Sequence, residues 1–282
     1  MTRRVIPLLS AAAIAIAGVA VSLSPPAHAE ALDDIKARGK MLVAIDPTFA
    51  PFEYTDASGN IVGFDPAVLE LVAEGMGVEI DYQVMGFSGI IPGLIAGSFD
   101  LTATALAVRK ERAERIDFTV PVAAGVSGIL RRGGDTKVAG TAPADLSGLK
   151  AAVKATTQPE QVLQGFNEEL EQKGMKPIEL LSVETVEQTI AALMAGRVDF
   201  VADDVAVLAT VIKARSDDLE IVGTVGPSVY ISWGTNKDDP ALNAALNEQI
   251  IALKESGRLA ELHMEYFGVT FDLPNENFIP AE

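Results

Sequence analysis

The sequence predicts an α/β fold built from two interleaved units of similar plan, and three observations lead to it. Short apolar segments alternate with stretches of helical periodicity, which is typical of sheets rich in parallel strands. Residues 94–103 and 193–202 also repeat one pattern, in which a helix stops at a glycine and a strand begins at an aspartate. The length of 282 residues allows two such units.

Turn residues and apolar spacing define the elements of the first half. A strand is predicted over residues 42–45, and Asp65-Pro66 is predicted to open a helix that ends at Gly75 and Gly77. A helix over residues 88–96 and a strand over residues 101–107 follow.

The second half repeats this order. The segment from Thr185 to Gln188 reads Thr-Val-Glu-Gln, a capping box that predicts a helix start. The strand after this helix ends at Asp203 and Asp204, which the internal repeat makes equivalent to the end of the strand over residues 101–107. A final helix is predicted over residues 253–267.

The N-terminus reads as a secretory leader. Residues 1–29 contain two arginines, a long apolar run and small residues at the cleavage position before Glu30. A single membrane anchor is the alternative, because the apolar run is almost long enough to span a bilayer, but the Ala-x-Ala ending disfavours it. We expect an exported protein of the periplasm.

Composition excludes several classes of function. The net charge of −17 becomes −19 when a leader with two arginines and no acids is removed, and so acidic a chain is unsuited to nucleic acid or anionic membranes. The absence of cysteine excludes disulfides and a lipoprotein anchor. We expect a monomer that depends on its hydrophobic core.

The strand over residues 101–107 leads straight into a charged cluster, and this junction is the first candidate site. Strand ends in open α/β sheets form binding crevices, and a guanidinium binds a carboxylate in a bidentate manner. Arg112 is the candidate for that role. The alternative is an exposed helix whose charges pair with one another, and this interpretation is preferred for the neighbouring Lys110, Glu111, Glu114 and Arg115.

The same stretch resembles the Thr-x-Glu-Arg-x-x-x-hydrophobic-Asp-Phe signature of family 3 of the extracellular solute-binding proteins. Those proteins deliver polar amino acids to ABC importers, and the glutamine-binding members are the most similar. Further segments match in order, namely residues 42–54, 63–65, 87–94, 156–158 and 196–204. The resemblance implies the type II two-lobed periplasmic binding protein fold, in which each lobe is a mixed, mostly parallel sheet flanked by helices.

The resemblance also implies how the chain divides. Residues 1–29 would be the signal peptide, residues 30–123 and 229–282 lobe 1, and residues 124–228 lobe 2. Small residues near both crossings suit hinge strands.

Carried over position by position, the family pattern implies a site between the lobes. Arg112 and backbone N–H groups near Thr157 would hold an α-carboxylate, and Asp204, beside Asp203, would hold the ammonium group. A helix cap is the alternative role for Asp204. A zwitterion that leaves water needs partners for both charges.

The rest of the implied site would meet the ligand's side chain. Phe49 and Phe87 would enclose its aliphatic part, although core packing is the alternative for both. Asp46 and Lys154 would meet its polar end, with a surface lysine as the equal alternative for Lys154. A neutral amide, as in glutamine, would satisfy both. If Lys154 faces solvent, the surplus of acids favours a cationic amino acid.

Three departures from the family pattern concern the residues that would meet the ligand's carboxylate and ammonium group. Ala107 stands where Ser or Thr usually adds a hydroxyl, Ala105 replaces Gly or Ser, and Arg109 replaces a common Thr. The turn before Thr156 also lacks the usual glycine. We therefore expect altered recognition of the carboxylate.

Catalysis has little support in the sequence. After leader removal one histidine remains, His263, and there is no cysteine, so histidine triads and thiol chemistry are excluded. We expect no metal, no cofactor and no enzymatic activity, with an amino acid and a membrane permease as partners. The alternatives are a periplasmic dehydratase acting on arogenate or prephenate, and a sensor subunit.

Overall fold

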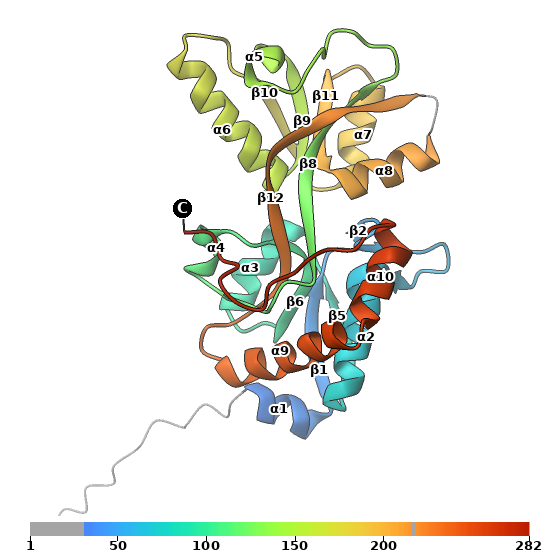
Figure 1. Cartoon of the computed structure of the whole chain (residues 1–282), viewed down its shortest axis with the longest axis vertical. Helices are drawn as coiled ribbons and strands as arrows, with labels where there is room; N and C mark the ends of the chain where they lie inside the picture. Colours follow the sequence, from blue (N-terminus) through green and yellow to red (C-terminus); the bar gives the residue numbers. More distant parts are fainter. Residues whose placement is uncertain (1–30, 216–217, 282) are drawn as a thin grey trace, which may run out of the picture.

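The computed structural model describes residues 31–215 and 218–281 and has two lobes joined by two long strands (Figure 1). The predicted leader lies outside the described residues. Within them, no helix is long and apolar enough to cross a membrane. The two-lobed α/β fold predicted from the sequence is confirmed.

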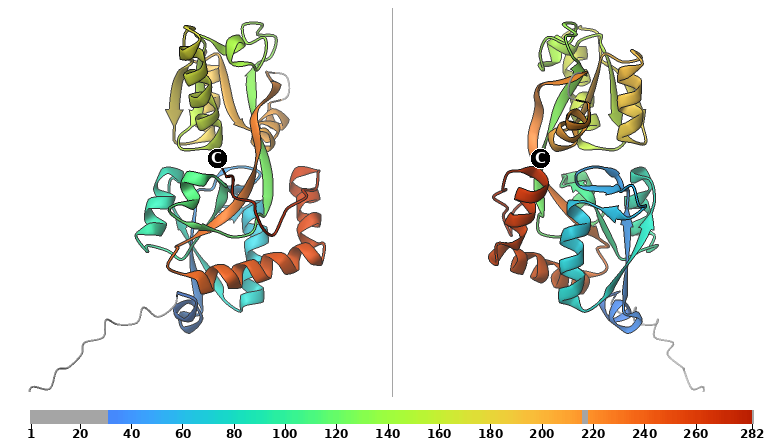
Figure 2. Two further views of the ribbon diagram at one scale, coloured as in Figure 1. Left: turned by 60° about the vertical axis from the view of Figure 1, so that its left-hand side comes forward. Right: turned by 90° about the vertical axis from the view of Figure 1, so that its right-hand side faces the viewer.

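Strands β8 (Ala123–Arg132) and β12 (Leu219–Thr235) run from one lobe into the other, and Figure 2 shows both crossings in two further views. They pair with each other in antiparallel fashion, with register shifts between Ile221 and Gly223 and between Val225 and Val229. One continuous sheet results, in the order β10-β9-β11-β8-β12-β6-β1-β5, with β7 paired to β12.

The lower lobe of Figure 1 contains both ends of the described chain. Its elements besides the crossing strands are α1 (Ala31–Arg38), β1 (Lys40–Ile45), β2 (Thr48–Phe49), β3 (Glu53–Thr55), β4 (Ile61–Val62), α2 (Phe64–Met76), β5 (Glu79–Val84), α3 (Phe87–Ile95), β6 (Leu101–Ala107), α4 (Lys110–Ala113), β7 (Asp117–Phe118), α9 (Pro240–Glu255) and α10 (Arg258–Phe267). Strands β5, β1 and β6 are parallel neighbours.

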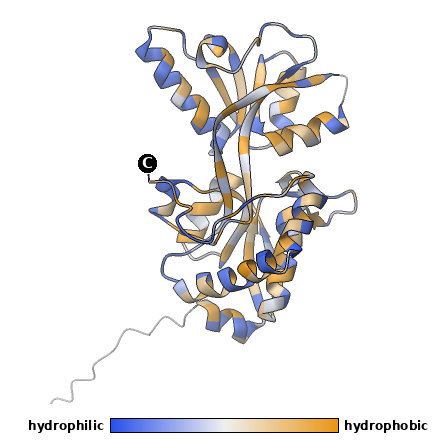
Figure 3. Cartoon of the chain, in the orientation of Figure 1, coloured by the Kyte–Doolittle hydropathy of each residue, from blue (hydrophilic) through white to orange (hydrophobic). Residues whose placement is uncertain are grey.

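Alternation along β6 explains the two layers of helices in this lobe. Leu101 and Ala103 belong to the core cluster shared with α2, α9 and α10, whereas Leu106 packs with Ile90 and Leu94 of α3. Successive side chains of a strand point to opposite faces, so this strand is covered on both. Figure 3 shows the apolar residues gathered on the strands and on one side of the helices.

The upper lobe repeats this plan. Its elements are α5 (Pro143–Leu146), β9 (Lys150–Lys154), α6 (Gln158–Gln172), β10 (Glu179–Val183), α7 (Val186–Met194), β11 (Phe200–Asp204) and α8 (Val205–Ala214). Ala151 and Phe200 pack toward α6, and Ala152 and Val201 pack toward α7 and α8. The parallel strands β10, β9 and β11 therefore lie between two layers of helices.

Three predicted elements are confirmed and two are corrected. Strand β6 and the capping box of α7 are as expected, and β1 is longer by two residues. Helix α2 begins at Phe64, with Gly63 rather than Asp65 at its N-cap, and it continues through Gly75 to Met76. Asp65 does not cap the helix because its side chain accepts from Ala105 and Trp233, which are distant in the sequence.

The predicted helix over residues 253–267 is two helices. Helix α9 ends at Glu255 and α10 begins at Arg258, because Gly257 adopts a left-handed conformation, with φ 78°, between them. His263 in α10 is buried, with Nε2 2.7 Å from the carbonyl of Val122 and its ring stacked on Phe64.

Candidate functional site

A narrow cavity of about 40 Å³ lies between the lobes. Eight of the ten predicted site residues line it, and Asp46 and Asp203 lie behind its wall. The residues that line it are Phe49, Phe87, Ala105, Ala107, Arg112, Gly125, Val126, Ser127, Lys154, Thr157, Gln158, Pro159, Asp204, Val229 and Ile231.

The ends of parallel strands supply the charged groups of the site. Arg112 follows β6, Lys154 ends β9 and Asp204 ends β11. Open α/β sheets bind ligands at the carboxyl ends of their strands. Here the strand ends of both lobes meet at one cavity.

Arg112 is a buried cation without a carboxylate partner in the described part of the chain. It is 5% exposed, and its guanidinium donates to the carbonyl of Ala107 at 2.9 Å and, across the lobes, to that of Thr156 at 2.7 Å. The guanidinium carbon Cζ of Arg112 lies 5.6 Å from the centre of the Phe87 ring. Burial, and next the charge of Arg109, lower the pKa of Arg112 to about 9. An anion bound beside Arg112 would compensate its buried positive charge.

Helix α6 points its N-terminus at the cavity. Thr157 is the N-cap residue, and Gln158 and Pro159 of the first turn also line the cavity. The hydroxyl of Thr157 donates to the carbonyl of Lys154 at 2.6 Å, which fixes the turn. Helix N-termini favour anions, so this end of the cavity suits a carboxylate.

Asp204 combines the two roles that its sequence position left open. It is the N-cap of α8, where Oδ1 accepts from the N–H of Ala206 at 2.8 Å, and it also lines the cavity. A Cβ at Gly125 would lie 2.2 Å from Oδ2, so the glycine makes room for the carboxylate. Burial raises the pKa of Asp204 to about 7, against the backbone hydrogen bonds that lower it.

Asp203 points away from the cavity lining. It is fully buried, Oδ1 accepts from the N–H of Asp204 at 2.8 Å, and Oδ2 has no hydrogen-bond partner. Burial raises the pKa of Asp203 to about 7 as well. Alternation along β11 separates the two acids, and only Asp204 reaches the cavity.

Lys154 and Asp46 form a buried ion pair across the lobes. Lys154 Nζ lies 2.7 Å from Asp46 Oδ2 and donates to Thr48 Oγ1 at 3.0 Å. Lys154 is 2% exposed, so the interpretation as a surface lysine is wrong. Asp46 also accepts from the N–H of Phe87 at 3.2 Å and the hydroxyl of Thr48 at 2.9 Å, which holds it behind the lining.

The aromatic residues belong to the cavity and to the core at once. Phe49 is in the main core cluster and stacks on Phe52 at 5.6 Å between ring centres. Lys154 Nζ lies 5.1 Å from the ring of Phe49 and 5.4 Å from that of Phe87. The cationic end of Lys154 therefore lies between two rings.

Two residues with positive φ lie at the cavity. Ala105 has φ 39° and Thr156 has φ 62°, a region that residues with a side chain rarely adopt. Ala105 is a position where the sequence departs from the family pattern, and Thr156 lies in the turn that lacks the usual preceding glycine. The carbonyl of Ala107 accepts from Arg112, and no side-chain hydroxyl is available at this position to donate to a carboxylate.

Sequence reasoning missed part of the lining. Gly125, Val126 and Ser127 of β8 line the cavity, and Val229 and Ile231 of β12 do so as well. The spacing of two between Val229 and Ile231 is the signal that the sequence offered. Among the described residues there is no group of three or more histidines and acids placed to hold a metal ion.

Comparisons with known proteins show the family to which the chain belongs. A profile of the bacterial extracellular solute-binding proteins, family 3, matches residues 41–269. The arginine-binding protein ArgT of Corynebacterium glutamicum is 32% identical over 200 residues, which cover 71% of this chain and 65% of ArgT.

Solved structures resemble the whole two-lobed body. A mutant of ArgBP from T. maritima matches with a TM-score of 0.75 and 29% identity, over 84% of this chain and 99% of ArgBP. The ancestral amino acid-binding protein AncCDT-1, a precursor of cyclohexadienyl dehydratase, matches with a TM-score of 0.76 and 25% identity, over 84% of this chain and 99% of AncCDT-1. The chain belongs to family 3 of the bacterial extracellular solute-binding proteins.

Proposed function

We propose that this protein captures a polar amino acid with an uncharged side chain between its lobes, in the periplasm, and delivers it to the permease of an ABC importer. One observation carries the proposal. The cavity presents a buried cation, Arg112, and a partly buried acid, Asp204, and neither has an ion-pair partner among the described residues. Their pKa values are shifted in opposite directions, each toward its neutral form.

A zwitterion supplies what both groups lack. Its carboxylate would pair with Arg112 and the N-terminus of α6, and its ammonium group would pair with Asp204. Each new pair would offset the desolvation that shifts the pKa of the protein group. Groups with shifted pKa values that line a cavity are characteristic of functional sites.

The ion pair of Lys154 with Asp46 supports an uncharged side chain on the ligand. The pair is neutral as a unit, so neither an acidic nor a basic side chain would gain a free partner there. Lys154 lines the cavity while Asp46 stands behind it, and a cationic side chain would meet Lys154 first. A carbonyl or hydroxyl could accept from Lys154, which favours glutamine-like amino acids.

The relatives support an amino acid as ligand and leave its identity to experiment. ArgT is named for arginine, and AncCDT-1 is an amino acid-binding protein. The ion pair is our reason to place glutamine-like ligands above arginine. The predicted leader supports export to the periplasm.

Capture would proceed by closure about β8 and β12. We place the hinge where these strands cross, with residues 30–123 and 229–282 in one lobe and residues 124–228 in the other. Arg112 with Thr156 and Lys154 with Asp46 contact across the lobes, and these contacts support a closed form.

The test is a panel of the twenty amino acids measured by calorimetry and small-angle scattering. We expect tight binding of glutamine or a similar amino acid, with compaction of the molecule. Arginine binding that weakens with salt, without glutamine binding, would replace the uncharged ligand by a cationic one. Absence of binding and compaction with every ligand would contradict the proposal.

The dehydratase alternative needs a separate assay. Asp204 is the acid that lines the cavity with a pKa near neutrality, which is the property a general acid requires. Arogenate and prephenate are incubated with the protein and the products measured. We expect no turnover.

A further inference from the structure

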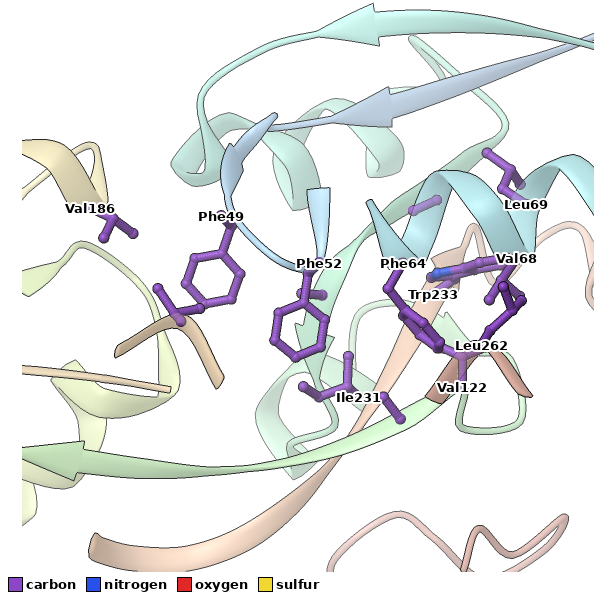
Figure 4. Close-up of a cluster of buried hydrophobic side chains, with 14 of the residues drawn as sticks. Phe49, Phe52, Phe64, Val68, Leu69, Val122, Val186, Ile231, Trp233 and Leu262 are labelled. Atoms are coloured by element: carbon purple, nitrogen blue, oxygen red, sulfur yellow. The ribbon is translucent and has the colours of Figure 1, made fainter. Parts of the chain in front are cut away.

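Two buried carboxyl groups lie behind the residues that line the cavity. Glu53 of β3 and Asp65 of α2 are 1% and 0% exposed, and neither forms an ion pair in the described part of the chain. Apolar groups surround them, and Figure 4 shows Phe52, Phe64 and Trp233 beside the start of α2. Neither residue belongs to the amino acid site described above.

Gly63 brings these two carboxyl groups together. Its φ is 129°, and a Cβ there would lie 2.4 Å from the carbonyl oxygen of Phe52 and 3.0 Å from Cα of Glu53, closer than packed atoms tolerate. The N–H of Asp65 donates to that same carbonyl at 2.9 Å. The helix start can therefore press against β3 only because residue 63 lacks a side chain.

The hydrogen bonds around the pair are unequal. Asp65 accepts from the indole N–H of Trp233 and from the backbone N–H of Ala105, both at 2.8 Å and on different oxygens. Glu53 accepts from the hydroxyl of Thr104 at 2.7 Å on Oε1, whereas Oε2 has no donor.

The hydrogen bonds decide where the proton resides. Asp65 has donors on both oxygens and is suited to the ionised form, while Oε2 of Glu53 is free to carry a proton. Burial, and next the charge of Asp65, raise the pKa of Glu53 well above its ordinary value. The other charged or titratable groups that act on the pair are Lys154, which favours ionised Glu53, and Tyr82.

We propose that Glu53 carries a proton while Asp65 is ionised, and that this pair positions two segments of the cavity wall. The inference rests on the proposed function, because it gives both residues a role in the amino acid site. Asp65 holds the N–H of Ala105, which lines the cavity at φ 39°. Glu53 holds Thr104, whose hydroxyl accepts from the N–H of Asp46 at 3.2 Å.

The pair thus holds Ala105 in its positive-φ conformation, and it also holds Asp46, the acid that pairs with Lys154. Residues held in a rarely populated conformation persist only where surrounding contacts enforce them. The charge-assisted bond from Ala105 to Asp65 is such a contact. Glu53 and Asp65 are positioning residues, since neither lines the cavity.

Isosteric variants test where the proton resides. Glutamine at position 53 has an N–H in place of the proton and an oxygen for Thr104, so Glu53→Gln should keep ligand affinity within about twofold. Asp65→Asn directs an NH₂ group at either Trp233 or Ala105, so it should weaken binding about tenfold or more. Equal losses in the two variants, or a larger loss in Glu53→Gln, would overturn the assignment.

A spectroscopic measurement tests the proton without any ligand. At a pH of about 8.5, above the pKa of about 7 of Asp203 and Asp204, the infrared spectrum should retain a protonated carboxyl band that disappears in Glu53→Gln. If wild-type protein lacks the band, or if the variant keeps it, Glu53 does not carry the proton.

Trp233 provides a second readout, because it is the only tryptophan of the chain. Its indole N–H resonance should be nearly unchanged in Glu53→Gln and displaced in Asp65→Asn. If both spectroscopic results hold while no amino acid binds, the proton pair stands and the proposed function fails. A displaced resonance in Glu53→Gln would count against the pair itself.

Discussion

Two regions of the cavity wall each contain a buried cation, and they differ in how its charge is compensated. Arg112 from the lower lobe and Lys154 from the upper lobe both lie against the ring of Phe87. Lys154 has Asp46 at 2.7 Å, whereas the partners of Arg112 within residues 31–215 and 218–281 are carbonyl oxygens. The Arg112 region therefore requires an anion from outside, and the Lys154 region is neutral without one.

This difference separates general affinity from specificity. Every amino acid has the carboxylate and the ammonium group that the unpaired charges require, so the Arg112 region and Asp204 would bind all of them. Only the side chain distinguishes one amino acid from another, and it would meet a region whose charge is already balanced. Changing the unpaired groups should abolish binding, and changing the paired ones should alter selectivity.

The largest effect is expected from Arg112→Ala, which removes the unpaired cation. Breaking a buried charge pair costs roughly 3–5 kcal/mol, so affinity should fall about 100- to 1,000-fold or more. Calorimetry with the best ligand of the panel measures it. Arg115→Ala is the matched control, because Arg115 is exposed three residues away. Similar losses in both variants would refute the role of Arg112.

The next effect is expected from Asp204→Asn, which separates the two roles of this residue. Asparagine caps a helix about as well as aspartate, so the melting temperature should change little. Loss of the charge should weaken affinity roughly 10- to 100-fold, because hydrogen bonds to charged groups contribute about 1.5–3 kcal/mol. Asp203→Asn is the control, since Asp203 lies behind the wall, and it should bind normally.

The pH dependence of binding follows from the pKa of Asp204, which burial raises to about 7. The ligand's ammonium group needs the ionised form, so affinity should fall up to about tenfold per pH unit below 7. Asp204→Asn should remove this slope.

The stability of the empty protein should change in the opposite sense. Because the folded pKa of Asp204 is raised from 3.8, its contribution is complete below the unfolded pKa and is lost as pH rises through about 7. Denaturation of the ligand-free protein across this pH range measures the change in the free energy of unfolding.

Affinity that is constant with pH would mean that Asp204 does not contact the ligand.

The smallest effect is expected at the paired cation. Lys154→Met leaves Asp46 without its partner, and a cationic side chain on the ligand could then neutralise it. The ratio of arginine to glutamine affinity should rise about tenfold, because glutamine also loses the donor to its side-chain carbonyl. Lys150→Met on the exposed start of β9 is the control. An unchanged ratio would place the ligand's side chain away from this ion pair.

Much of the fold could be predicted from the sequence, because local residues encode it. Glycines and caps marked most helix ends, and the alternation of strands and helices gave the α/β class. The prediction failed at Asp65 and at residues 253–267, where the deciding contacts or the left-handed Gly257 were not visible in the apolar pattern.

The charged residue types of the site were also determined by sequence, but their partners were decided by tertiary structure. The sequence alone placed Arg112, Lys154 and Asp204 at strand ends. Whether a buried charge is paired depends on which distant strand end comes within about 4 Å of it, because electrostatic energy inside a protein changes steeply with distance and burial. Folding therefore decided that Lys154 meets Asp46 while Arg112 stays unpaired, and that Glu53 lies against Asp65.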